Sequence, residues 1–276
     1  ELGSTSQFGT IYGGKFYIVS KQEKDPGATV TGSRLAVIDA KTMKVLKEFT
    51  KIGDSDGRSF LGVDEHTGYI GTSNGIFLYD IDKMEIGERI TGTENTSGSL
   101  YSAQIGTMIR VGDRVFAVHQ KNGLLVIDAK THTLETTILK PEEHEGHGLG
   151  SIVLSKDGTI WASPTVELTG TGASLPLIWK VDPTTLTVQQ VDIPTASGIE
   201  EIPNSWYAWT ADGFCASTKE NKIYWKGQGT GSWFTGYKIF CYDIDKNEFY
   251  KVFDFGKVEG DWRLYGTGFR IDPVSD

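Results

Sequence analysis

Leu35-Ala-Val-Ile-Asp39-Ala-Lys-Thr-Met-Lys-Val45 is the stretch that decides the fold, because versions of it occur five times in the chain. The others are Ile76-Phe-Leu-Tyr-Asp80, Leu124-Leu-Val-Ile-Asp128, the segment around Asp182 and Ile239-Phe-Cys-Tyr-Asp243, each followed by a polar turn and an apolar run. Each copy reads as a hairpin in which the Asp side chain bonds the backbone of the turn that follows. Five copies predict five copies of one structural unit.

A second hairpin precedes each copy and gives the unit four strands. In the first unit Phe8–Tyr12 meets Lys15–Val19 across Gly13-Gly14, a dipeptide suited to a tight reversal. The repeated Asp residues fall at positions 39, 80, 128, 182 and 243, with spacings of 41, 48, 54 and 61 residues. Propeller blades repeat at roughly 40 to 50 residues. The sequence therefore predicts an all-β fold, a β-propeller of four-stranded blades with five blades present.

The last residues look like the start of a sixth blade. Gly266-Thr-Gly-Phe-Arg-Ile-Asp-Pro-Val-Ser-Asp276 lines up with Ser59 to Gly68, the first strand and turn of a blade. An open propeller leaves strand edges and an unsealed core. We therefore expect residues 1–276 to form a single propeller domain that is incomplete at its C-terminus and belongs to a seven- or eight-bladed whole.

Charge and hydropathy limit the function classes. The chain has 36 Asp and Glu against 27 Lys and Arg, so it lacks the basic surface that a nucleic-acid partner requires. No apolar run reaches the roughly 20 residues of a membrane-spanning helix. The chain starts at Glu1 without Met, and we expect membrane association only through an N-terminal lipid anchor that has been removed.

The repeats resemble a known propeller family. Val37-Ile-Asp-Ala-Lys-Thr42 and Val181-Asp-Pro-Thr-Thr185 are similar to the YVTN-type propeller repeat, and Ser6 to Tyr17 together with Tyr265 to Pro273 resembles the DUF5074 group of surface propellers from gut Bacteroidetes. The resemblance covers essentially the whole chain. It implies an exported protein at the cell surface or in the periplasm, often a lipoprotein, and relatives in the group capture corrinoids such as cobalamin for an outer-membrane transporter. No corrinoid motif of the family maps onto named positions here.

Propeller geometry predicts where a ligand would bind. The connections between blades and the loops joining the second and third strands of each blade open on one face, where polar and aromatic side chains gather. The predicted ligand-binding residues are Lys21, Arg58, Tyr101, His119, Gln120, His147, Trp206, Tyr207, Trp225, Trp233, Trp262, Arg263 and Tyr265. Aromatic rings flanked by polar groups suit a small organic molecule or a glycan, although such rings also wedge blades together in many propellers.

The remaining motifs do not identify a metal site or a catalytic site. His144, Glu145 and His147 have zinc-ligand chemistry but lie in one loop without the helical spacing of metalloproteases, so we predict no metal and no cofactor. Neither a Ser nucleophile elbow nor a catalytic Cys–His spacing is present, and no catalytic residue is named. The main hypothesis is a surface propeller that captures a small molecule or glycan, a corrinoid among them, for a transporter. The alternatives are a lactonase- or quinoprotein-like enzyme with a metal or cofactor at the channel mouth, and a protein-interaction scaffold.

Overall fold

The computed structural model describes most of the strands of the chain. Described residues are 5–21, 33–52, 57–94, 105–119, 121–140, 148–165, 177–192, 207–208, 214–228 and 237–254. All regular elements among them are β-strands, arranged in five antiparallel sheets, so the predicted all-β propeller of four-stranded blades is confirmed. The segment predicted to begin a sixth blade lies outside the described residues.

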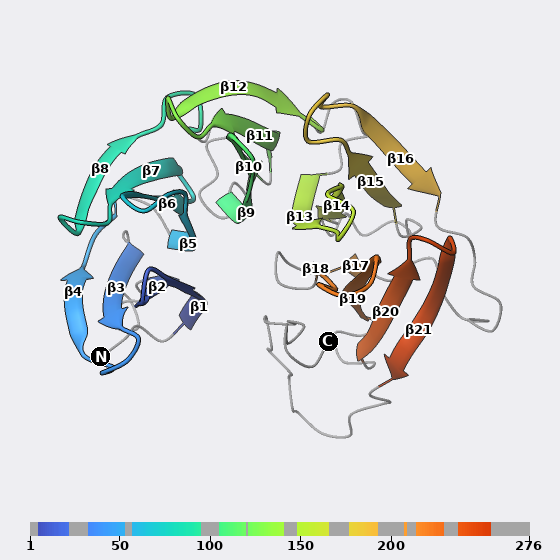
Figure 1. Cartoon of the computed structure of the whole chain (residues 1–276), viewed down its shortest axis with the longest axis horizontal. Helices are drawn as coiled ribbons and strands as arrows, with labels where there is room; N and C mark the ends of the chain where they lie inside the picture. The colour runs from blue at the N-terminus through green and yellow to red at the C-terminus, as the bar shows by residue number, and fades with distance from the viewer. Residues whose placement is uncertain are drawn as a thin grey trace, which may run out of the picture. The chain divides into compact units, whose positions relative to one another are not determined.

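The five blades follow one another along the chain (Figure 1). Blade 1 contains β1 (Thr5–Tyr12), β2 (Lys15–Lys21), β3 (Ser33–Asp39) and β4 (Val45–Phe49). Blade 2 contains β5 (Gly57–Gly62), β6 (Thr67–Thr72), β7 (Gly75–Asp80) and β8 (Glu85–Arg89). Blade 3 contains β9 (Ile105–Val111), β10 (Arg114–His119), β11 (Gly123–Asp128) and β12 (Thr133–Ile138).

Blade 4 contains β13 (Gly148–Leu154), β14 (Ile160–Thr165), β15 (Leu177–Val181) and β16 (Val188–Asp192). Blade 5 contains β17 (Tyr207–Ala208), β18 (Phe214–Ala216), β19 (Lys222–Gln228), β20 (Tyr237–Asp243) and β21 (Glu248–Asp254). Both β17 and β18 pair with β19, so together they occupy the place of the first strand of blade 5.

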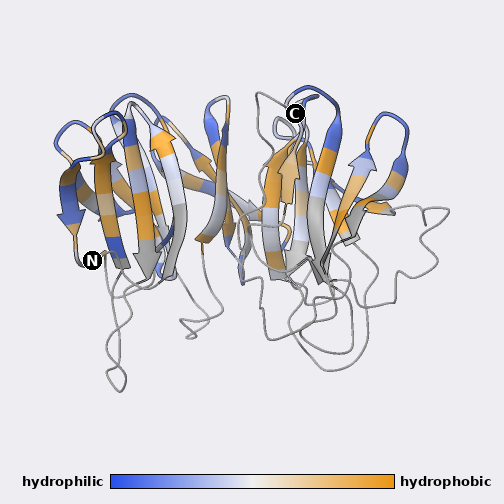
Figure 2. Cartoon of the chain, turned by 90° about the horizontal axis from the view of Figure 1, so that it is seen from below, coloured by the Kyte–Doolittle hydropathy of each residue, from blue (hydrophilic) through white to orange (hydrophobic). Residues whose placement is uncertain are grey.

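The chain divides into two compact units, residues 1–140 with blades 1 to 3 and residues 141–276 with blades 4 and 5. In each unit the first strand of a blade lies innermost and the last strand lies at the outer edge (Figure 1). A single domain over the whole chain stays a prediction. Hydrophobic residues lie mainly on the strands, whereas the turns at one end of the blades are mainly hydrophilic (Figure 2).

The repeated Asp caps the turn between the third and fourth strands, as the sequence predicts. In blade 3 an oxygen of Asp128 accepts hydrogen bonds from the backbone N–H of Lys130 at 2.8 Å and of Thr131 at 2.7 Å. The N–H of Thr131, and then that of Lys130, holds the pKa of Asp128 below its usual range. Asp39, Asp80, Asp182 and Asp243 accept at least one equivalent backbone bond.

A second feature of this turn is a left-handed residue four positions after each Asp. Its φ angle is 57° at Met43, 54° at Met84, 56° at His132, 61° at Leu186 and 53° at Asn247. Among these residue types Asn and His are enriched in that conformation, whereas Met and Leu are not. In blades 1, 2 and 4 the Asp cap and the strand pairing therefore impose a backbone geometry that the side chain at this position does not select.

Blades pack through their sheet faces around aromatic residues on the second strand. Tyr17 of blade 1 is fully buried and stacks on Phe60 of blade 2, with 3.9 Å between ring centroids. In the second unit Trp161 of blade 4 packs against Tyr242 of blade 5 at 5.6 Å. Each such ring removes a large apolar area from water, which stabilises the contact between neighbouring blades.

Candidate functional site

Strand register places Lys21, Arg58 and His119 at one end of the blades of residues 1–140. Gly57, where β5 begins, pairs with Thr72, where β6 ends, and Ile105, where β9 begins, pairs with His119, where β10 ends. The Oγ of Ser59 donates to the backbone oxygen of Ile105 at 3.2 Å and joins these ends of blades 2 and 3. We call this end, where first strands begin and second strands end, the entry face.

Two predicted site residues have described side chains, and both lie on the entry face. Arg58 is the second residue of β5 and is half-buried, whereas His119 is the last residue of β10 and is fully buried. Lys21 ends β2 and Tyr207 begins β17, so their backbones also lie at strand ends. Trp225 was expected at a strand end, but β19 continues to Gln228 and leaves Trp225 in its middle.

The other predicted site residues lie outside the described residues. They are Tyr101, Gln120, His147, Trp206, Trp233, Trp262, Arg263 and Tyr265. The loop with His144 and Glu145 also lies there. The aromatic part of the predicted ligand surface therefore stays a prediction.

The His119 side chain is neutral, and its two ring nitrogens have different surroundings. Its Nδ1 accepts hydrogen bonds from the backbone N–H of Lys121 at 3.3 Å and of Asn122 at 3.0 Å. A nitrogen that accepts carries no proton, so the ring proton is on Nε2. Burial lowers the pKa of His119 to about 4 and keeps the ring neutral. Among the described residues, the buried Nε2 has no hydrogen-bond partner.

Asn122 connects His119 of blade 3 to polar groups that follow the strands of blade 2. Asn122 Nδ2 donates to the backbone oxygen of Glu94 at 3.3 Å, and the Glu94 carboxylate pairs with Arg89 at 3.4 Å. Arg89 in turn reaches the backbone oxygen of Asn74, in the turn between β6 and β7, at 3.5 Å. We call Asn74, Arg89, Glu94, His119 and Asn122 the entry-face network.

The entry-face network combines donors and acceptors in a way that suits an uncharged polar ligand. The guanidinium of Arg89 and the carboxylate of Glu94 are each about one-third exposed, at 34% and 33% of the side chain. The pair balances its own charge, so it presents hydrogen bonds without a strong net field. Sequence reasoning found His119 but missed Arg89, Glu94 and Asn122, because only the packing of blade 2 on blade 3 brings them together.

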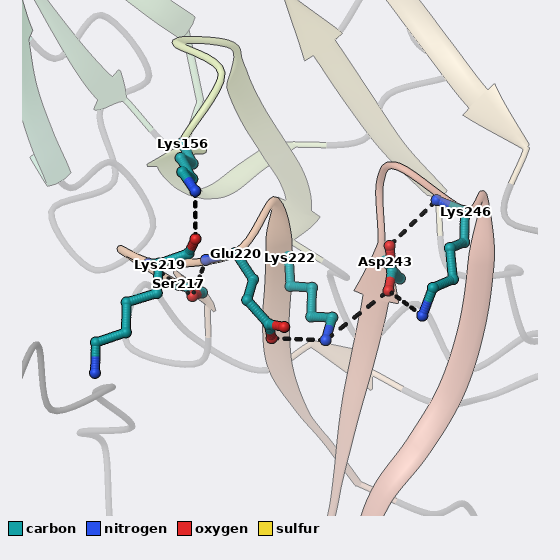
Figure 3. A network of polar contacts seen from close by, with 7 residues as sticks. All are labelled: Lys156, Ser217, Lys219, Glu220, Lys222, Asp243 and Lys246. Atoms are coloured by element: carbon teal, nitrogen blue, oxygen red, sulfur yellow. Dashed lines mark hydrogen bonds and ion pairs between the residues drawn. The ribbon is translucent and has the colours of Figure 1, made fainter. Parts of the chain in front are cut away.

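The opposite end of the blades has a structural role. In blade 5 Lys222 pairs with Glu220 at 2.6 Å and with Asp243 at 3.9 Å, and Lys246 also pairs with Asp243 at 3.2 Å (Figure 3). Burial raises the pKa of Asp243, but the bonds and charge of Lys246 outweigh this and hold that pKa below its usual range. Lys156 of blade 4 donates to the backbone oxygen of Lys219 and links the two blades. These contacts fix turns and neighbouring blades.

The described part of the chain offers neither a metal-binding cluster nor a membrane-spanning helix. It contains no group of three or more His, Cys, Asp or Glu side chains arranged to hold a metal ion. Within the same residues no helix is long and apolar enough to span a bilayer.

Comparison with known families decides the identity of the repeat. The family model of a domain of unknown function, DUF5074, matches residues 1–276. The chain belongs to the DUF5074 family. The resemblance deduced from the repeated phrases is therefore confirmed. No protein of curated function matches this DUF5074 chain.

Solved structures share the fold of this DUF5074 propeller. The extracellular domain of BT4673 from B. thetaiotaomicron has been solved twice, described once as part of a one-component system and once as part of a hybrid two-component system. The TM-scores are 0.62 and 0.61 at 15% identity, and each match covers 92% of this chain but only 28% of the BT4673 chain. The RRP9 WD40 repeats match at TM-score 0.59 and 8% identity, covering 96% of this chain and 68% of theirs.

Proposed function

We propose that this DUF5074 propeller is an exported surface protein that binds a small organic molecule or a glycan on its entry face. The observation that carries the proposal is the buried Nε2–H of His119, a hydrogen-bond donor without a partner among the described residues. A buried donor left unpaired costs roughly 1–3 kcal/mol. A ligand oxygen that reached this donor would recover that free energy.

The surroundings of His119 support a ligand with several hydroxyl or amide groups. Asn122 links His119 to the donors and acceptors of Glu94 and Arg89, and Arg58 lies at the entry-face end of blade 2. Small-molecule sites combine apolar walls with a few well-placed polar groups of this kind. The predicted tryptophans and tyrosines of the long loops would supply the apolar area.

Localisation and transport are part of the proposal. BT4673, whose extracellular domain shares the fold, and the family resemblance both favour an exported protein at the cell surface or in the periplasm. A lipid anchor is proposed from the family resemblance alone. A corrinoid is one candidate ligand, because it carries amide side chains around a flat ring, and delivery to an outer-membrane transporter would follow capture.

Thermal-shift measurements with cobalamin and with plant and mucin oligosaccharides test the proposal. We expect one of these probes to raise the melting temperature of the 276-residue chain. His119→Asn should remove most of that shift, because Asn can accept from Lys121 and Asn122 but cannot place a donor at the position of Nε2. His66→Asn is the matched control, since His66 lies at the opposite end of blade 2, where it bonds Asp82 at 2.6 Å.

The outcomes separate the hypotheses. If no probe shifts the melting temperature, or if His119→Asn binds as well as the unmodified chain, the entry-face site is wrong. Equal losses in His119→Asn and His66→Asn would point to a general effect on stability.

A further inference from the structure

The entry face contains both Asn-Gly pairs of the chain, Asn74-Gly75 and Asn122-Gly123. Each pair joins the second strand of a blade to the third, because Gly75 begins β7 and Gly123 begins β11. An Asn that precedes Gly is especially prone to lose its side-chain amide, since the glycine has no Cβ to hinder the approach of its backbone nitrogen to the Asn Cγ. This chemistry makes the two turns candidates for spontaneous modification.

The fold retains the glycine in both pairs. The φ angle is 108° at Gly75 and 107° at Gly123, in the region that favours glycine. A Cβ on Gly75 would lie 2.8 Å from Oγ1 of Thr93. A Cβ on Gly123 would lie 2.6 Å from the backbone oxygen of Leu139. Any other residue would therefore strain either turn, and the folded structure depends on the reactive pair.

The backbones of the two Asn residues are held in the same way. The N–H of Asn74 donates to Oγ1 of Thr72 at 3.0 Å. The N–H of Asn122 donates to Nδ1 of His119 at 3.0 Å. Thr72 ends β6 and His119 ends β10, so each Asn is bound by the last residue of the second strand. The two pairs therefore differ mainly in the contacts of the Asn side chains.

The side chain of Asn122 is tethered, whereas that of Asn74 is not. Nδ2 of Asn122 donates to the backbone oxygen of Glu94 at 3.3 Å, so rotation of this amide breaks a contact between blades 2 and 3. Among the described residues only the backbone groups of Asn74 form hydrogen bonds. Asn74 is half-buried, and its amide atoms, unlike Nε2 of His119, remain in contact with solvent. Its Cγ can therefore turn towards the nitrogen of Gly75.

We propose that Asn74 is a modification site that deamidates in the folded chain, whereas Asn122 is protected. The backbone nitrogen of Gly75 loses its proton and bonds to Cγ of Asn74, and Nδ2 leaves as ammonia, which gives a cyclic succinimide. Water then opens the ring, and no oxidant or reductant takes part. Cleavage of the bond from the Gly75 nitrogen to Cγ gives aspartate. Cleavage of its bond to the backbone carbonyl carbon of Asn74 gives isoaspartate.

Either product changes the entry-face network. The backbone oxygen of Asn74 accepts from Arg89 at 3.5 Å, and Arg89 pairs with Glu94 at 3.4 Å. A new carboxylate at position 74 would compete with Glu94 for the guanidinium, and isoaspartate would also lengthen the main chain beside it. The reaction requires no ligand, whereas its effect on ligand binding rests on the proposed function.

Peptide mapping of the aged 276-residue chain tests the proposal. After incubation of the folded chain at mildly alkaline pH, mass spectrometry of proteolytic peptides should show conversion at Asn74 at least about fivefold faster than at Asn122, the protection that one hydrogen bond of ordinary strength provides. In urea the tether is lost, so the two rates should become similar. Asn74→Gln should remove the fastest phase of ammonia release from the folded chain, because Gln must close a larger ring and reacts far more slowly.

Equal conversion at the two positions of the folded chain would overturn the proposal, because the tether would then have no effect. Faster conversion at Asn122 would also overturn it. The same holds if Asn74 stays intact in the folded chain under conditions that convert it in urea. Cobalamin and oligosaccharides take no part in these measurements, so a failure of those probes to bind leaves the result at Asn74 unchanged.

Discussion

His119 is fully buried at the entry face, its ring is neutral, and its Nε2–H has no partner among the described residues, so its titration should be measurable. Burial lowers its pKa to about 4, against about 6.5 in the unfolded chain. The unfolded state therefore takes up a proton between these values while the folded state does not. Stability should decrease as the pH falls from about 6.5 to about 4, by up to about 3 kcal/mol. Urea unfolding of the wild type and of His119→Asn across this range checks the prediction, because the decrease in the variant should be smaller by this contribution of His119.

His66 should change the pH dependence of stability in the opposite direction to His119. The hydrogen bond and charge of Asp82 raise the pKa of His66 in the folded state. The stability that His66 contributes is therefore present below its pKa in the unfolded state and is lost as the pH rises through its pKa in the folded state. His66→Asn should therefore retain the acid-side loss that His119 causes. If both variants lost it, the assignment to His119 would be wrong.

At the scale of the strands, the aromatic rings between blades explain how one blade holds the next. Tyr69 and Tyr17 are both fully buried, but Tyr69 bonds His132 of the next blade, whereas the hydroxyl of Tyr17 has no partner among the described residues. Tyr69→Phe should cost about 1 kcal/mol for the lost bond, while Tyr17→Phe should be neutral or stabilising by about 1 kcal/mol. Denaturant melts of the two variants compare them directly, and equal losses would contradict this explanation.

Most of the strands and turns could be predicted from the sequence. Strand pairs and Asp-capped turns depend on residues close in the chain, so five repetitions of one phrase were enough to predict them. The left-handed residue after each cap gave no consistent signal, because Met or Leu occupies it in three of the five blades. The entry-face network was only partly predicted, since the bond from Asn122 to Glu94 joins blades that meet only after folding.

For the whole chain, stability should behave as a sum of blades and their nearest-neighbour contacts, as in other repeat proteins. The cluster around Tyr69 lies entirely within residues 1–140, and the cluster around Trp161 lies entirely within residues 141–276. A cavity in one cluster removes contacts only from the blades that share it. Its effect should therefore be local.

Tyr69→Ala and Trp161→Ala form a matched pair for this prediction. Each deletes a buried ring and should cost about 3–5 kcal/mol. Hydrogen exchange should then accelerate by about 10²- to 10⁴-fold in β5–β12 of Tyr69→Ala and in β13–β21 of Trp161→Ala, because amides report the free energy of the cooperative unit that opens. Amides of the other unit should retain their rates in each variant. Uniform acceleration along the chain would show instead that all five blades open together, and nearest-neighbour additivity would fail.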